Sequence, residues 1–175
     1  MGELDVDVLL LSVGADLPYL TGYEAMPLER LTMLVLPRAG DAQLVVPRLE
    51  APRVEPQADV FEIVAWDETE DPVALVATLA GRPGRAAIGD HTWARFVLDL
   101  QTAMPGTEFI RASGVVGPLR AVKDDAEIAA LARAADAVDQ IAAEMRLRPF
   151  AGRTELDVHR ELVERILAAG HERAN

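Results

Sequence analysis

Cysteine is absent from the 175 residues, and basic side chains are few, with 17 lysines and arginines against 29 acidic residues. The absence of cysteine excludes disulfides, thiol catalysis and cysteine metal sites. The resulting formal charge of −12 repels phosphate backbones. We therefore expect no nucleic acid partner.

Long apolar runs are also missing, and nothing in the sequence is long enough to span a bilayer. The first five residues, Met-Gly-Glu-Leu-Asp, contain no basic segment followed by an apolar core. We expect a protein without membrane contact, and the cytoplasm is the default location.

Motifs for self-contained hydrolase chemistry are absent too. Ser12 and Ser113 lack a Gly-x-Ser-x-Gly elbow, and the sequence has no His-Glu-x-x-His helix. His91, His159 and His171 are scattered, so we interpret them as solvated or structural histidines rather than metal ligands. The acidic run at residues 67–71 is interpreted as a solvated loop rather than a cation site.

Half of the residues are hydrophobic, and they are arranged in short periodic segments. Apolar runs at residues 6–12, 31–36, 42–46 and 60–66 predict strands. Residues 14–20 predict a turn or short helix. The second and third strands are separated by Pro-Arg-Ala-Gly-Asp, which predicts an antiparallel hairpin.

Helices and strands then alternate. Helices are predicted at 72–80 and 92–104, strands at 86–89 and 108–111, and a linker at 114–118. A hairpin followed by alternating units predicts an α/β fold with a mixed sheet and helices on both faces.

Residues 118–145 contain the predicted long helix. Asp124 and Glu127 form a capping-box pattern at its start, and apolar residues from Ile128 to Met145 recur on one face. Thr154 and Asp157 begin a second helix, which we expect to end at Gly170. Apolar faces without a sheet to cover favour association, so we expect a dimer or larger assembly.

Three short motifs, in order, resemble one family. They are Tyr19-Leu20-Thr21-Gly22-Tyr23, the segment Leu119-Arg120-x-Val122-Lys123-Asp124-x-x-Glu127-Ile128, and Gly152-x-Thr154-Glu155 with Ala169-Gly170-His171-Glu172. Together they resemble the creatinase, prolidase and aminopeptidase P family, and the pattern is most similar to that of proline dipeptidases. Asp124 stands where the family has a serine cap, which keeps the capping chemistry.

The resemblance implies two parts. Residues 1–117 would be the creatinase/prolidase N-terminal domain, with a ribonuclease-H-like fold. Residues 118–175 would be a linker and the first two helices of an incomplete pita-bread catalytic domain. In that family two divalent metals, manganese, cobalt or zinc, are held by ligands that would lie beyond Asn175. We therefore expect this chain to be a fragment without catalytic or metal residues and to be inactive alone.

The resemblance also singles out the loop at residues 23–30. Its Tyr23, Glu29 and Arg30 match a prolidase loop that reaches the active site of a partner subunit, although Leu28 replaces a histidine. Glu29 would hold the amino end of a proline-containing peptide and Arg30 its carboxylate. The alternative is a surface ion pair at the entrance of a strand.

For the parent protein, the resemblance implies a metal-dependent Xaa-Pro dipeptidase or aminopeptidase. In this reading the N-terminal part forms a homodimer and gates the substrate. Two alternatives stay open. One is a non-catalytic relative that serves as a protein-interaction module, and the other is a creatinase-like amidinohydrolase.

Overall fold

The computed structural model describes residues 1–174, which form two compact units. The first comprises Met1–Ala121, and the second begins at Val122. The sequence boundary expected between residues 117 and 118 falls inside a helix of the first unit. The two units are described separately below.

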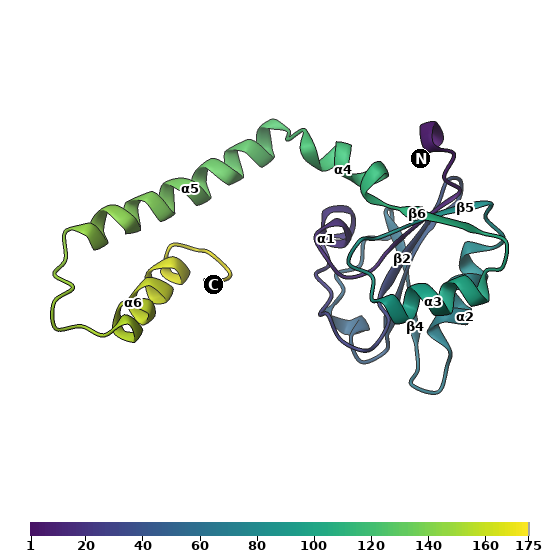
Figure 1. The fold of residues 1–175 in the computed structure, drawn as a ribbon, viewed down its shortest axis with the longest axis horizontal. Coiled ribbons are helices and arrows are strands. Elements are labelled where there is room, and N and C mark those ends of the chain that lie inside the picture. The colour runs from purple at the N-terminus through teal and green to yellow at the C-terminus, as the bar shows by residue number, and fades with distance from the viewer. Residues whose placement is uncertain (175) are drawn as a thin grey trace. The chain divides into compact units, whose positions relative to one another are not determined.

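The first unit is built on one mixed sheet of six strands in the order β4-β3-β2-β1-β5-β6 (Figure 1). The strands are β1 Val8–Leu11, β2 Met33–Pro37, β3 Ala42–Pro47, β4 Phe61–Trp66, β5 Arg85–Ile88 and β6 Glu108–Arg111. The strand β2 is antiparallel to both of its neighbours, whereas the β3–β4, β1–β5 and β5–β6 pairs are parallel. The predicted hairpin is the β2–β3 pair, and its prediction is confirmed.

The strand β1 lies inside the sheet, between β2 and β5, and all four of its residues are buried. A strand covered on both faces needs apolar side chains at consecutive positions, which is why its sequence is a run rather than an alternation. Val8 pairs with Pro37 on one side and with Ala86 on the other.

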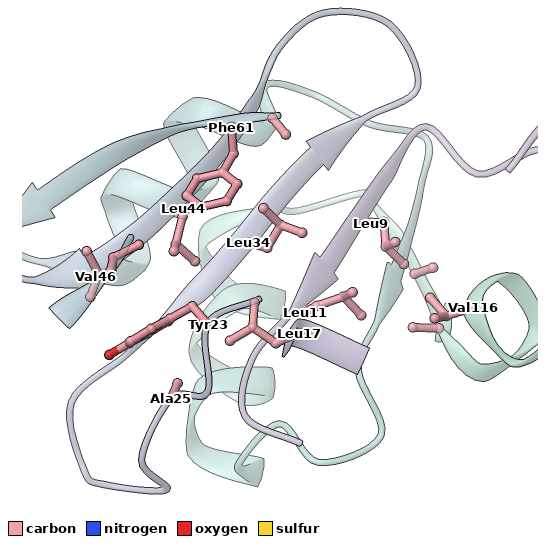
Figure 2. Close-up of a cluster of buried hydrophobic side chains, with 14 of the residues drawn as sticks. Leu9, Leu11, Leu17, Tyr23, Ala25, Leu34, Leu44, Val46, Phe61 and Val116 are labelled. Carbon is pink, nitrogen blue, oxygen red and sulfur yellow. The ribbon is translucent and has the colours of Figure 1, made fainter. Parts of the chain in front are cut away.

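Helices cover both faces, as predicted. On one face α1 (Asp16–Thr21) and α4 (Ser113–Ala121) contribute to a core that includes Leu9, Leu11, Leu17, Leu34, Leu44, Val46 and Val116 (Figure 2). On the other, α2 (Pro72–Ala80) and α3 (Ala94–Ala103) complete a core that includes Val8, Leu10, Met33, Val35, Val45, Val76, Phe96 and Leu100. Short 3-10 helices lie at Gly2–Leu4 and Ala51–Arg53.

The expected linker at residues 114–118 is wrong, because those residues belong to α4. Gly114, Gly117 and Pro118 are poor helix formers, but Val116 is fully buried in the core. Arg120 pairs with Asp16 of α1 at 2.7 Å. Packing on α1 and the sheet therefore outweighs the local sequence preference.

The second unit is a pair of helices, α5 (Asp125–Arg146) and α6 (Glu155–Ala168). Both predicted capping boxes are present, with Asp124 and Glu127 on α5 and Thr154 and Asp157 on α6. Glu161 of α6 pairs with Arg148 and Arg153 of the loop between the helices, and Arg165 of α6 pairs with Glu144 of α5.

Much of the predicted apolar face of these helices is exposed. Ile141 and Met145 are buried, while Ile128, Leu131, Val138, Leu156 and Leu167 are exposed. Within residues 1–174, no helix is both long and apolar enough to cross a membrane.

Candidate functional site

The segment between α1 and β2 contains the three residues singled out from the sequence. Gly22 ends α1 in the left-handed conformation at φ 68°, and its amide donates to the carbonyl of Pro18 at 2.8 Å. Burial then alternates, with Tyr23 and Ala25 buried and Glu24 and Met26 exposed. One side of the segment therefore belongs to the core and the other faces solvent.

Tyr23 is a core residue. It is 7% exposed and lies in the same cluster as Leu17, Leu34 and Val46 (Figure 2). Burial raises the pKa of its phenol, and the negative charge of Glu50 raises it further. The ring thus anchors the segment, and the phenol lies within the electrostatic reach of an acidic residue.

Arg30 lies next to β2 and binds two carboxylates. Its Nη2 is 3.3 Å from Oε1 of Glu50, and its Nη1 donates to Oε1 of Glu68 at 3.3 Å. Glu50 follows β3 and Glu68 follows β4. Because β3 and β4 are parallel neighbours and β2 runs antiparallel to β3, the end of β3, the end of β4 and the start of β2 meet at one edge.

The two carboxylates differ greatly in exposure. The side chain of Glu50 is 6% exposed, that of Glu68 is 62% exposed, and that of Arg30 is 27% exposed. Nε of Arg30 and Oε1 of Glu50 are buried without a hydrogen bond, so the 3.3 Å contact is an ion pair whose geometry does not make a hydrogen bond. Glu50 is therefore a buried charge whose neutralisation comes from Arg30.

The acidic neighbours also shift the pKa of the arginine. Desolvation lowers the pKa of Arg30, but the hydrogen bond to Glu68 and the charges of Glu50, Glu68 and Glu29 outweigh it and raise the pKa. The guanidinium is positively charged at every relevant pH.

A cavity of about 410 Å³ adjoins this edge and is lined by Arg48, Leu49, Trp66, Asp67, Glu68 and Thr69. Arg48 donates to Asp67 at 2.6 Å, and Nε1 of Trp66 donates to the carbonyl of Leu31 at 2.9 Å. All five residues of the acidic run at 67–71 are exposed, as expected of a solvated loop. Its Asp71 caps α2 by accepting from the amides of Val73 and Ala74.

Glu29, one of the three residues proposed from the sequence, lies close enough for its charge to raise the pKa of Arg30, but its side chain is exposed. The ion pairs of Arg30 are made with Glu50 and Glu68, which the sequence reasoning did not associate with it. No local pattern could have found them, because these partners lie at the ends of other strands. A role for Tyr23, Glu29 and Arg30 in substrate binding stays a prediction.

The histidines do not gather with other ligands. His91 packs against Gly14, where an added Cβ would lie 2.9 Å from Nδ1 of the imidazole and where φ is 112°. Among residues 1–174, no three His, Asp or Glu side chains are placed to hold a metal ion. The side chains described here therefore do not fit a dinuclear metal site.

Comparison with known proteins gives a consistent result. The sequence model of a family described as "Creatinase/Prolidase N-terminal domain" matches residues 1–122. The probable dipeptidase PepE of Mycobacterium bovis is 39% identical over 167 residues, which cover 93% of this chain and 44% of that protein. The chain thus spans less than half the length of this curated relative.

Solved structures agree. The dipeptidase PepE from Mycobacterium ulcerans superposes with a TM-score of 0.82 at 37% identity, over 98% of this chain and 47% of that one. A recombinant prolidase from Thermococcus sibiricus superposes with a TM-score of 0.80 at 28% identity, over 96% of this chain and 46% of that one.

Proposed function

The chain belongs to the creatinase/prolidase N-terminal domain family, and from this membership we propose that it is the oligomer-forming and substrate-gating part of a proline-directed dipeptidase or aminopeptidase. One observation carries the proposal: similarity to a dipeptidase extends over 93% of this chain but only 44% of that protein. The similar structures named as dipeptidase and prolidase favour a peptidase over a creatinase-like amidinohydrolase.

In this proposal catalysis belongs to parts of the parent protein outside this chain. Two divalent ions, manganese, cobalt or zinc, would supply a bridging nucleophilic water there. No three His, Asp or Glu side chains among residues 1–174 are placed to hold a metal ion, and the proposal assigns the metal-dependent steps to the rest of the parent protein. The helices α5 and α6 would be the first two helices of the pita-bread domain, and a cytoplasmic location is part of the same proposal.

The loop of Tyr23, Glu29 and Arg30 would contribute to the active site of a partner subunit in a homodimer. Arg30 offers a charged, planar donor to the carboxylate of a short peptide, and Glu29 offers an exposed acid to its amino end. Exposed apolar side chains on α5 and α6 support contacts with further protein surface.

The experiment compares the parent protein with this chain alone, each purified and supplied with manganese, on Ala-Pro and on longer Xaa-Pro peptides. We expect metal-dependent cleavage by the parent and none by this chain. A parent that cleaves no Xaa-Pro bond would contradict the proposed activity. Cleavage by this chain alone would contradict its non-catalytic role.

Replacing Arg30 tests the loop in the parent. Arg30→Ala should lower kcat/KM for dipeptides about ten- to a hundredfold, because a charge-assisted contact is lost. Longer peptides should lose less, since their carboxylate lies elsewhere. Because Arg30→Ala also leaves buried Glu50 unpaired, Arg30→Lys is the matched variant, which keeps the charge and removes the planar donor. Equal losses for short and long substrates would show that Arg30 is structural.

A further inference from the structure

The two carboxylates on Arg30 use different nitrogens and differ in freedom. Glu50 faces Nη2 and is confined, whereas Glu68 faces Nη1 from a side chain that is mostly in solvent. One contact can therefore be exchanged while the other stays.

Charge makes such an exchange necessary. Arg30 carries one positive charge, while Glu50 and Glu68 carry two negative charges, and Glu29 adds another nearby. A substrate carboxylate arriving at this guanidinium would be a further acid at an already negative site. Like charges at this distance repel, so one acid has to leave before another can bind.

Burial decides which carboxylate leaves. Glu68 can rotate into water, where its charge is solvated at little cost. Glu50 has no such exit, because its side chain is almost fully buried and Arg30 is its counter-ion.

We propose that Glu68 is a specificity-determining residue that occupies, in the resting protein, the position on Arg30 taken by the free carboxylate of a dipeptide substrate, while buried Glu50 positions the arginine. The inference rests on the proposed function of Arg30. It adds that substrate affinity is set by competition between two carboxylates for Nη1. Substrates without a carboxylate at this position do not displace Glu68 and are indifferent to it.

The turn that carries Glu68 is held independently of Arg30. The amide of Asp67 donates to Oε2 of Glu70 at 2.6 Å, and the amide of Glu70 donates to the carbonyl of Asp67 at 2.8 Å. Neutralising Glu68 therefore removes a competitor without dismantling its turn. Asp67 on the same turn pairs with Arg48 instead, which makes it a matched control.

The test measures KM and kcat of the metal-loaded parent on Ala-Pro and on a longer Xaa-Pro peptide. Glu68→Gln should lower KM for Ala-Pro about two- to fivefold, the range expected for removing an exposed ion pair. The kcat for Ala-Pro and the KM for the longer peptide should not change. Asp67→Asn should leave both KM values at wild type. In a background of Arg30→Gln with Glu50→Gln, which removes the positive charge without leaving Glu50 unpaired, the effect of Glu68→Gln should largely disappear, because no cation remains for two carboxylates to compete for.

Each outcome decides the inference. Absence of Ala-Pro cleavage by the wild-type parent would overturn the proposed function and this inference together. Cleavage by wild type with an unchanged or higher KM in Glu68→Gln would overturn the inference alone. A similar fall in KM for Asp67→Asn would attribute the effect to the net charge of the turn, and would likewise overturn it.

Discussion

Substitutions of Tyr23 can distinguish a role in the core from a role in substrate binding. The Tyr23 side chain is buried, and the negative charge of Glu50 acts on its phenol group. Truncation by Tyr23→Ala removes an aromatic ring from a packed cluster, which costs about 3–5 kcal/mol. The free energy of unfolding of a domain is about 5–15 kcal/mol, so about a fifth or more of it would be lost. For a unit the size of Met1–Ala121, the melting temperature should fall by roughly 10–20 °C.

Tryptophan fluorescence during urea unfolding is a suitable assay. Both tryptophans, Trp66 and Trp93, lie in the first unit, so the signal reports on that unit alone. Tyr23→Phe keeps the ring and should cost no more than about 1 kcal/mol. Tyr19→Ala is the control, because Tyr19 is 41% exposed, lies outside the core cluster, and its truncation should cost about 1 kcal/mol at most.

Two results would refute this reasoning about Tyr23. A cost below about 1 kcal/mol for Tyr23→Ala would show that the ring does not support the core. A Phe variant as unstable as the Ala variant would show that the hydroxyl group, rather than the ring, carries the stability. In the parent protein proposed above, loss of the proposed dipeptidase activity in a stable Tyr23→Phe variant would instead assign the hydroxyl to the substrate.

Two further predictions concern the second unit and the acid range. Asp124→Ala should destabilise α5 by about 1 kcal/mol, measured by thermal circular dichroism. Asp125→Ala is the control, because it removes the same charge but leaves the Asp124 cap in place, and it should cost less. Equal losses would show that the cap is unimportant. The hydrogen bond from Arg111 holds the pKa of Asp90 below its ordinary 3.8. The stability contributed by ionised Asp90 is therefore complete above that value and is lost as pH falls through the lower folded pKa. In urea unfolding, the midpoint of Arg111→Gln should lie below that of wild type at pH 7, and the two midpoints should converge towards about pH 2. A difference that stays constant with pH would contradict the assignment.

Local signals made much of the fold predictable from the sequence. Pro72 and Gly81 mark the ends of α2, and Asp124 with Glu127 marks the start of α5. These signals act over a few residues, and a single sequence displays them directly. The mixed sheet followed from the order of such segments.

Contacts between distant residues could not be predicted in the same way. The helix α4 contains two glycines and a proline and exists because Val116 is buried and Arg120 meets Asp16. The partners of Arg30 were hidden for the same reason, since they depend on which strand ends share an edge. The sequence could place Arg30 in a loop, but the topology of the sheet decides what binds it.

The central position of β1 has a consequence for synthesis on the ribosome. Residues up to Trp66 complete β1 to β4, but the other edge of β1 pairs with Ala86–Ile88, which emerge later. Until then the nascent chain presents a fully apolar strand with unpaired backbone groups, the kind of edge that recruits foreign strands. Slow translation between Trp66 and Ile88, or substitutions that weaken β5, should therefore reduce the yield of folded protein more than equally destabilising changes in the β2–β3 hairpin.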